Sequence, residues 1–395
     1  MQAMARTLDI CIRGGGIVGH VLALLLARER LRVGLVVAPA PLAQADVRAY
    51  ALNQRARSLL EDLRCWPEAP DVTPVAAMHV KEAGGGAVHF DASVLAVPAL
   101  AWIVDVPALE ARLAQAVRFQ PQISLLEAPL DATLTVICEG RGSVSRQQFG
   151  VEQDVMSYAQ CAIAARLSAE LPHQQVACQW FTPQDILGLL PMGGEGGNLL
   201  AAVWSIPSDQ KTQWLEASQE MFEDRLSTAS EGRFGRLRLA SARRAWPLQL
   251  ATAQQWSGTR DGRAWVLAGD AAHAVHPLAG QGLNLGLADV QLLASEIHGR
   301  DYWRGVDDPK GLRRYERARK ADVALMSTAT DGLQQLFGRA GGGWQSVRNW
   351  GLRGFDNSGL IKAWVARQAM GLAKSKPGDK TPEQPDSAAQ PTGPA

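Results

Sequence analysis

The sequence predicts an α/β fold in which a Rossmann-like dinucleotide-binding domain is interleaved with a mixed β-sheet domain, followed by C-terminal helices. A glycine cluster at Gly14–Gly19 stands between a strand-like run and an apolar helical pattern. Short runs of β type fill the chain between Tyr158 and Trp246. A second glycine-rich loop precedes another helical pattern near Gly282, so we expect one domain to be assembled from segments far apart in the chain.

Composition limits the class of protein before any motif is considered. With 395 residues, of which 47% are hydrophobic, the chain can bury a large core and form two connected domains. Forty basic and 39 acidic residues give a net charge of +1, which excludes the overall positive field of a nucleic-acid-binding protein. The five cysteines are scattered and form no C-x-x-C pair, which indicates a reducing compartment and neither a disulfide framework nor a zinc site.

The first domain segment has the local pattern of a dinucleotide site. Leu8–Ile12 is typical of a buried strand, and Arg32–Val37 of a second one. Between them, Gly14 permits the tight turn, Gly16 lets the backbone approach a pyrophosphate, and Gly19 allows close packing of helix and strand. The following helix N-terminus favours phosphate.

One element of that pattern is absent. The acid that normally ends the second strand and binds the adenosine ribose would fall near Val37 or Ala38, where no acid stands. The nearest acid, Asp46, lies well into the next loop. Either other groups bind the ribose or adenosine is bound more weakly.

The second glycine-rich loop carries a carboxylate at a strand end. The apolar run Arg263–Ala268 predicts a strand, and Asp270 follows it where its carboxylate can accept hydrogen bonds from a sugar-like hydroxyl chain. Gly280 and Gly282 lack a Cβ, so this loop can lie against a flat ligand. The helix expected from Gly282 presents its positive end, which favours an anion such as the N1 region of a reduced flavin.

The whole string Gly269–Leu287, G-D-A-A-H-A-V-H-P-L-A-G-Q-G-L-N-L-G-L, resembles the second FAD motif of the ubiquinone-biosynthesis hydroxylases of the UbiH/UbiF type, within the class of single-component aromatic-ring hydroxylases. The resemblance extends over roughly residues 8 to 372 and implies a p-hydroxybenzoate-hydroxylase-like fold with a Rossmann-like FAD-binding domain. It implies that this loop contacts FAD through Gly269, Asp270, Pro277, Gly280, Gly282, Leu283 and Asn284.

Two further segments resemble the same family. Glu139–Arg146 is similar to its A-D-G-x-x-S-x-x-R segment, which implies contact with FAD and the reduced nicotinamide cofactor through Glu139 and Gly140. Glu139 replaces the family's Asp and is one methylene longer, so its hydrogen bond is expected to be displaced. Arg48 lies in a segment similar to the one whose arginine approaches the flavin. Asp105 is either an acid near the flavin ring or a helix cap.

The expected domains alternate along the chain, and the chain ends in a Pro-rich polar tail. We expect the FAD-binding domain at residues 1–70, 100–155 and 250–300, the substrate domain at 71–99 and 156–249, a C-terminal helical region at 301–373, and a disordered tail at 374–395.

The function that the resemblance implies is hydroxylation of an aromatic ring, on a polyprenyl phenol in ubiquinone biosynthesis. It implies FAD as cofactor, NADPH or NADH as electron donor, dioxygen as co-substrate and a flavin C4a-hydroperoxide as oxidant. A lipid-like phenolic substrate calls for a biosynthetic complex or a peripheral contact at the inner face of the membrane, for a protein expected in the cytoplasm. No catalytic residue is assigned, and His273 and His276 have no further ligand near them in the sequence that would indicate a metal site.

Two other functions stay open at this point. The same motifs would serve a hydroxylase of a soluble small phenol, and the missing ribose acid together with Glu139 is compatible with a non-catalytic FAD-binding scaffold of a biosynthetic complex. A flavin-dependent halogenase is disfavoured, because Ala202 stands where the first Trp of the W-x-W-x-I-P signature would be.

Overall fold

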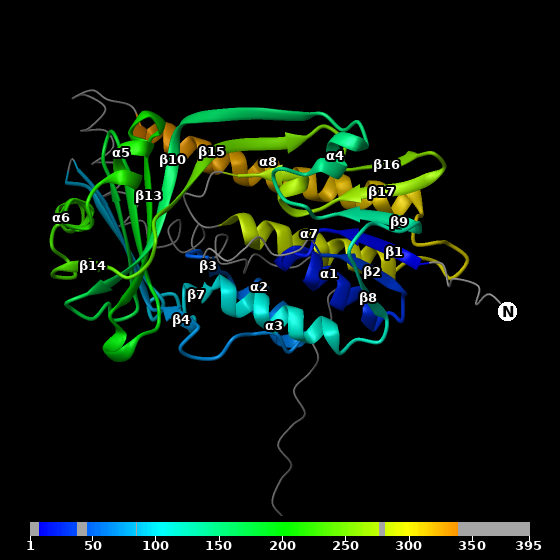
Figure 1. Ribbon diagram of the computed structural model, residues 1–395, viewed down its shortest axis with the longest axis horizontal. Helices are drawn as coiled ribbons and strands as arrows, with labels where there is room; N and C mark the ends of the chain where they lie inside the picture. The colour runs from blue at the N-terminus through cyan, green and yellow to red at the C-terminus, as the bar shows by residue number, and fades with distance from the viewer. Residues whose placement is uncertain (1–7, 38–45, 84, 276–280, 339–395) are drawn as a thin grey trace, which may run out of the picture.

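The computed structural model describes residues 8–37, 46–83, 85–275 and 281–338, the last twelve of these by their backbone alone. Among the described residues, three sheets and a set of helices form an elongated α/β molecule (Figure 1). Pro277 and Gly280, two of the predicted FAD contacts, lie outside the described residues, as does everything after Gly338.

The first sheet has six strands and carries the dinucleotide-type topology. In spatial order they are β16 (Ser257–Arg260), β17 (Arg263–Leu267), β9 (Ala132–Ile137), β1 (Leu8–Arg13), β2 (Val33–Val36) and β8 (Ile123–Leu126). All neighbours pair in parallel except β16, which forms an antiparallel hairpin with β17. Its central strands are buried on both faces and read as continuous apolar runs, as expected for a parallel sheet.

Helices cover this sheet and join its strands. They are α1 (Ile17–Arg28), α2 (Gln54–Asp62), α3 (Val106–Arg118), α4 (Val144–Gln148), α7 (Gln281–His298) and α8 (Pro309–Gly338). The helix α1 is apolar nearly all round because it packs between α3 and α7 as well as on the sheet. Asp105 caps α3 by accepting a hydrogen bond from the Ala108 backbone N–H at 3.1 Å, so the structure favours the cap role over the flavin-edge role.

The second sheet has nine strands. They run β18 (His273–Ala274), β15 (Arg244–Ala253), β10 (Gln153–Ala169), β13 (Leu199–Pro207), β12 (Ile186–Pro191), β11 (Val176–Phe181), β5 (Ala77–Glu82) and β6 (Ala87–Asp91), with β14 (Leu237–Leu239) also paired to β10. Only β11 and β5 pair in parallel; the other neighbours are antiparallel. One face packs on α6 (Gln219–Ala229) and the adjacent α5 (Lys211–Glu216), and the other faces the first domain.

A third sheet lies between the other two. It consists of β3 (Ala49–Leu52), β7 (Ala101–Asp105) and β4 (Val72–Val75), all antiparallel. The sequence does not predict it, because its strands are only four or five residues long and pair with partners that are distant in the chain. Its inner side packs on the nine-stranded sheet through Ile103, Val75 and Ala177.

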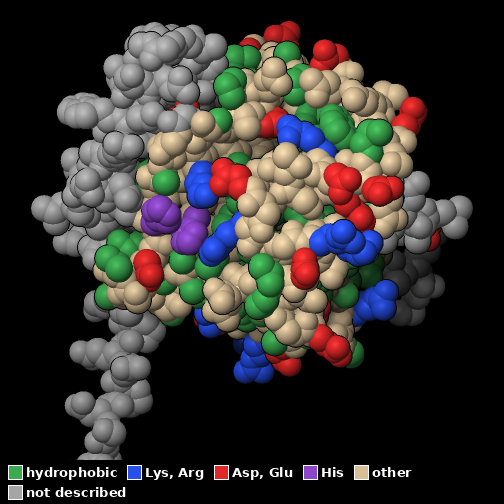
Figure 2. All heavy atoms as spheres, turned by 90° about the vertical axis from the view of Figure 1, so that its left-hand side faces the viewer, with side chains coloured by type: hydrophobic (Ala, Val, Ile, Leu, Met, Phe, Trp, Pro, Cys, Tyr) green, Lys and Arg blue, Asp and Glu red, His purple; other side chains and the backbone are tan. Residues whose placement is uncertain are grey.

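The predicted fold class is confirmed: a parallel dinucleotide-type sheet is interleaved with a mixed sheet, and helices follow. The expected domain boundaries stay a prediction. Where Figure 2 turns the nine-stranded sheet toward the viewer, acidic and basic side chains are interspersed over that end of the molecule. Among the described residues, no helix combines the length and apolar character that crossing a bilayer requires.

Candidate functional site

A cavity of about 680 Å³ lies where the N-termini of α1 and α7 meet β3 and the inner face of the nine-stranded sheet. Its walls differ in chemistry. The α1 and α7 side contributes backbone of glycine-rich turns and the polar side chains of Arg48, Arg141 and Asp270. The sheet side contributes small and apolar residues, among them Met78, Ala177, Ile186, Gly188, Leu190 and Ala201.

The first glycine motif is built by close backbone contacts. A Cβ on Gly14, whose φ is +119°, would lie 2.5 Å from the Cys138 carbonyl oxygen, and a Cβ on Gly19 would lie 1.9 Å from the Gly14 carbonyl oxygen. Gly14 and Gly19 are therefore required by the turn itself. Gly16 has open space where a Cβ would be, lines the cavity and caps α1 without a side-chain bond, so the free N–H groups of the first turn face the cavity.

The adenosine end has no acid at the expected place. β2 ends at Val36, and a Cβ on Gly15 would lie 2.9 Å from a methyl of Val37, so an apolar side chain packs on the glycine turn. Asp46 instead accepts hydrogen bonds from Arg48, with Nε at 2.9 Å from both carboxylate oxygens. Burial would raise the pKa of Asp46, but Arg48 lowers it below its ordinary value, so the carboxylate is committed to the arginine.

Arg48 lines the cavity as predicted for a flavin-side arginine, although its guanidinium is already paired. Besides Asp46, its Nη2 lies 3.9 Å from Oε1 of Glu110 on α3. Whether Arg48 touches the cofactor stays a prediction.

The carboxylate of Glu139 is turned away from the cavity. It accepts hydrogen bonds from the Ser143 hydroxyl at 2.8 Å, the Ser145 hydroxyl at 2.6 Å and the Ser145 backbone N–H at 2.9 Å. The longer side chain thus reaches the N-terminus of α4, and only its neighbours Cys138, Gly140 and Arg141 line the cavity. The predicted FAD contact of Glu139 receives no support from this geometry, whereas Gly140, at φ +80°, lies in the wall.

Arg146 joins this loop to the second glycine-rich loop. Its guanidinium is buried and donates hydrogen bonds to the Ala271 carbonyl oxygen at 3.1 Å and the Arg141 carbonyl oxygen at 3.0 Å. Burial lowers the pKa of Arg146. The matching arginine of the motif therefore fixes the two loops relative to one another.

Asp270 projects into the cavity from the turn after β17. Gly269 begins this turn with φ +64°. A Cβ at this position would lie 3.3 Å from a methyl group of Val18 on α1. About half of the Asp270 side chain, 46%, is exposed to the cavity, and the protein encloses the rest. This burial raises the pKa of Asp270, while His273 and Arg141 act in the opposite direction. Such a carboxyl is suited to accept hydrogen bonds from hydroxyl groups of a bound polyol.

The N-terminus of α7 lies against the same space. Gln281, Gly282, Leu283 and Asn284 line the cavity. The amide of Asn284, however, is used to hold β3: its Oδ1 accepts from the Asn53 backbone N–H at 3.0 Å, and its Nδ2 donates to the Ala51 carbonyl oxygen at 2.9 Å. Asn284 thus joins α7 to β3, and its side chain has little left to offer a ligand.

The sequence motifs missed several polar residues of the wall, among them Tyr50, Glu110 and Arg141. Tyr50 lies two residues after Arg48, and Arg141 directly follows Gly140, so both could have been found by their place in the motifs. Glu110 depends on how α3 packs on β3, for which the sequence gives no signal. Among the described residues, no group of three or more His, Cys, Asp or Glu side chains is arranged to bind a metal.

The geometry therefore offers a helix N-terminus for phosphates at α1, a carboxyl for hydroxyl groups at Asp270, and a second helix N-terminus at α7, all bordering the same cavity. An extended ligand with a diphosphate, a polyol and a flat ring would meet a complementary group at each position. The opposite wall is, in its described residues, uncharged and mostly apolar, and it leaves space beside that ring.

Comparison with known proteins agrees with the chemistry of this side of the cavity. The model of the family described as FAD binding domain matches residues 127–330. The chain is similar to the 3-demethoxyubiquinol 3-hydroxylase of Escherichia coli, 29% identical over 92% of this chain and 98% of that protein. It is also similar to the ubiquinone hydroxylase UbiL of Rhodospirillum rubrum, 29% identical over 93% of this chain and 91% of that protein.

Solved structures share the fold. PqsL of Pseudomonas aeruginosa, in complex with 2-aminobenzoylacetate, superimposes with a TM-score of 0.72 at 19% identity, over 88% of this chain and 99% of that chain. The p-nitrophenol 4-monooxygenase PnpA of Pseudomonas putida gives 0.70 at 18% identity, over 92% and 96%.

Proposed function

The chain belongs to the FAD binding domain family, and on this premise we propose that it hydroxylates the aromatic ring of a lipid-like phenol in ubiquinone biosynthesis. FAD is its cofactor, NADPH or NADH its electron donor and dioxygen its co-substrate. The relatives named for ubiquinone hydroxylation support the proposal along nearly the whole chain.

One observation carries the substrate class. Among the described residues that line the cavity, none that comes from the nine-stranded sheet is charged. A carboxylate on the ring would receive no compensating cation from the sheet itself, whereas an isoprenoid chain would gain by burial. The small side chains of Ala177, Gly188 and Ala201 leave the space that such a chain requires.

Bound FAD, once reduced, supplies the activation of dioxygen and the transfer of one oxygen atom. The residues of this chain bind and orient. The α1 N-terminus at Gly16 would hold the diphosphate, and the Asp270 carboxyl the hydroxyl chain next to the ring. The apolar sheet would hold the phenol beside the flavin ring and exclude water, so that the activated oxygen is transferred to the phenol and is not lost to water.

The route of the substrate is part of the same proposal. A lipid-like phenol has to reach the cavity from a membrane or from a partner that carries it, so we expect a peripheral contact with the inner face of the membrane or membership of a biosynthetic complex, in the cytoplasm. The dependence on NADPH or NADH is supported by the chemistry of the family and by the chain's likeness to monooxygenases.

The experiment that tests the proposal is turnover with defined phenols. The purified protein is reconstituted with FAD, and oxidation of NADPH and NADH is followed with a polyprenyl phenol, with the same ring without its tail, and with no phenol. We expect oxidation coupled to a product that is heavier by one oxygen, and preference for the tailed phenol. Turnover of the tail-less ring alone would favour a hydroxylase of soluble phenols.

The alternative of a non-catalytic scaffold is separated by the same samples. A scaffold would bind FAD and show no phenol-dependent oxidation with either nucleotide. Protein that stays colourless after incubation with FAD would contradict both functions.

A further inference from the structure

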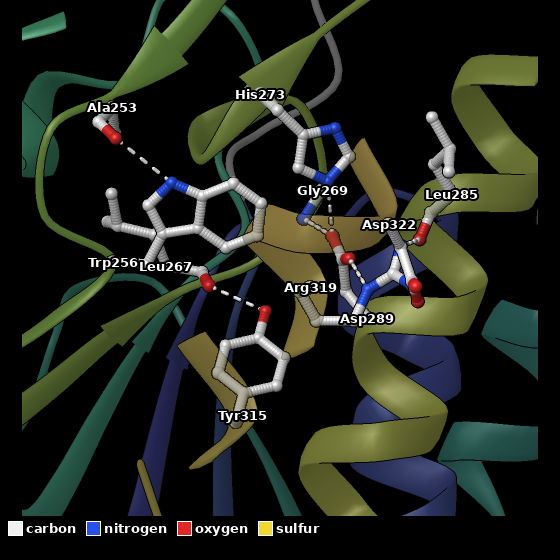
Figure 3. A network of polar contacts seen from close by, with 10 residues as sticks. All are labelled: Ala253, Trp256, Leu267, Gly269, His273, Leu285, Asp289, Tyr315, Arg319 and Asp322. Atoms are coloured by element: carbon white, nitrogen blue, oxygen red, sulfur yellow. Dashed lines mark hydrogen bonds and ion pairs between the residues drawn. The ribbon is translucent and has the colours of Figure 1, made fainter. Parts of the chain in front are cut away.

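A buried carboxylate that no part of the flavin motif accounts for lies behind the Gly269–Asp270 turn. Asp289 of α7 is 0% exposed and does not line the cavity. Figure 3 shows that three groups, two from the segment after β17 and one from α8, converge on it. These are the backbone N–H of Gly269, the imidazole of His273 and the guanidinium of Arg319 on α8.

The two carboxylate oxygens of Asp289 have separate tasks. Oδ1 accepts a hydrogen bond from Nε of Arg319 at 2.6 Å. Oδ2 accepts from the Gly269 N–H at 2.8 Å and contacts Nε2 of His273 at 2.7 Å. One oxygen therefore binds the compensating charge, and the other binds the turn that bears Asp270.

The charge of Asp289 is compensated inside the protein by Arg319. Arg319 is 3% exposed, and its other nitrogens bind Asp322 at 2.7 Å and the Leu285 carbonyl oxygen at 3.3 Å. Burial would raise the pKa of Asp289, but His273 and Arg319 lower it below its ordinary value, so Asp289 is an anion. A buried anion of this kind is costly unless it is paired and hydrogen-bonded, and both oxygens of Asp289 have partners.

Aromatic packing holds the partners of Asp289 in place. The ring of His273 stacks on Trp256, with centroids 5.0 Å apart and planes at 24°. Trp256 is itself fixed by a hydrogen bond from Nε1 to the Ala253 carbonyl oxygen at 3.0 Å, and Tyr315 donates to the Leu267 carbonyl oxygen at 2.9 Å (Figure 3). The end of β17 and the turn after it are thus bound from the side opposite to the cavity.

We propose that Asp289 is a positioning residue for the cofactor: by accepting the Gly269 N–H it fixes the turn that directs Asp270 into the cavity. Gly269 is in the left-handed region, and its N–H has the Asp289 carboxylate as its acceptor, so this side chain fixes the point at which the chain turns after β17. This inference rests on the FAD part of the proposed function and on nothing about the substrate.

The test compares two double variants that differ in one acceptor. Asp289→Asn/Arg319→Met keeps an amide oxygen for the Gly269 N–H, and Asp289→Leu/Arg319→Met replaces it by an apolar group of similar shape. Both remove the buried charges together, so neither leaves an unpaired ion. We expect the Leu double variant to bind FAD roughly tenfold or more weakly than the Asn double variant, because its Gly269 N–H is left without an acceptor.

The measurements are the Kd of FAD, from fluorescence quenching well below the unfolding temperature, and the visible circular dichroism of the flavin at saturation. A structural role alone would lower the unfolding temperature of the apo-protein without changing either quantity in the folded fraction. Equal affinities and equal flavin spectra in the two double variants would overturn the proposal.

A single variant keeps the test decisive if the Leu double variant does not fold. Arg319→Met retains the acceptor and loses only the compensating charge, so it should unfold at a lower temperature while its folded form binds FAD within about threefold of the wild type. Folded Arg319→Met protein that has lost FAD affinity would contradict the proposal. If the wild type itself binds no FAD, the cofactor assignment is wrong, which is a different outcome.

Discussion

Nε of Arg141 lies 3.9 Å from Oδ2 of Asp270, and Nη1 of the same guanidinium donates a hydrogen bond to the Pro247 carbonyl oxygen at 3.2 Å. A single side chain thus reaches from the loop after β9 to the carboxyl in the cavity and to the nine-stranded sheet. It is 37% exposed and adds positive charge to a wall expected to bind a diphosphate ligand.

Replacing Arg141 by Gln should weaken FAD binding about three- to tenfold, because an anionic ligand loses one nearby cation. The loss should shrink at high ionic strength, where the attraction of the wild type is screened. Titration of apo-protein with FAD at two salt concentrations measures both effects. The control is Arg317→Gln, an exposed arginine of α8 outside the cavity, which should leave the affinity unchanged at either salt concentration.

Replacing Asp270 by Asn should stabilise the apo-protein and weaken FAD binding. Burial raises the pKa of Asp270, which means that the charged carboxylate is less stable in the folded state than in the unfolded chain. The stability gained by the Asn variant should therefore be present at neutral pH and disappear below the unfolded pKa of about 3.9, where the wild type is protonated as well. Unfolding temperatures of both apo-proteins across pH measure this.

The affinity of the Asn variant for FAD should fall by roughly tenfold, because a neutral acceptor replaces a charge-assisted one. Flavin content unchanged from the wild type would show that Asp270 does not bind the cofactor.

Replacing Gly16 by Ala should separate folding from cofactor binding. The added Cβ meets no atom of the protein within 4 Å, so the stability of the apo-protein should change by less than about 1 kcal/mol. The same methyl group enters the space at the α1 N-terminus, and FAD affinity should fall at least tenfold. Gly142→Ala, also without a contact within 4 Å, is the control and should retain FAD.

Replacing Gly188 by Leu should affect the phenol and spare the flavin. Its Cβ would lie 3.6 Å from the Val203 carbonyl oxygen, an ordinary contact, and the side chain would enter the apolar part of the cavity. We expect unchanged FAD affinity, a KM for the tailed phenol raised several-fold and more NAD(P)H oxidised per product formed. The exposed Ala242→Leu serves as the control, and unaltered kinetics at Gly188 would place the phenol elsewhere.

Acid should destabilise the protein partly through Asp289. Its pKa is lowered in the folded state, so its contribution is present above the unfolded pKa of about 3.9 and is lost as the pH falls through the folded value. Arg319→Met removes one of the groups that lower this pKa, so acid unfolding should begin at higher pH. Arg32→Met, which breaks an exposed ion pair with Asp9, should shift the acid midpoint much less.

The sequence predicted the parts of the site that depend on backbone. Gly14, Gly19 and Gly269 are required by contacts of 1.9 to 3.3 Å that a Cβ would make, so their spacing already encodes the turns. Several strands of the two large sheets, such as β1, β11 and β13, were predictable as well, because their burial follows the apolar pattern. The small sheet of β3, β7 and β4 was not, since its short strands are defined by their partners.

Side-chain roles were less predictable than backbone roles. Glu139 stands at a motif position but bonds to Ser143 and Ser145, and Asn284 stands at another but holds β3. Each was drawn to a nearer hydrogen-bond partner that only the folded chain supplies. Asp289, buried one turn beyond the motif, gave no signal because a lone acid in a helix is normally a solvent-exposed residue.

The strand β10, Gln153–Ala169, pairs with β15 from Gln153 to Ala164 and with β13 from Gln160 to Ser168, and Figure 1 shows it extending from the nine-stranded sheet toward α4. Seventeen residues in one strand span roughly 55 Å. No loop interrupts this element, so a continuous strand, and not a flexible connection, links the sheet that lines the cavity to the region near α4. The protein would then accommodate different phenols by rearranging side chains, and a shorter or longer substrate would change contacts in the cavity.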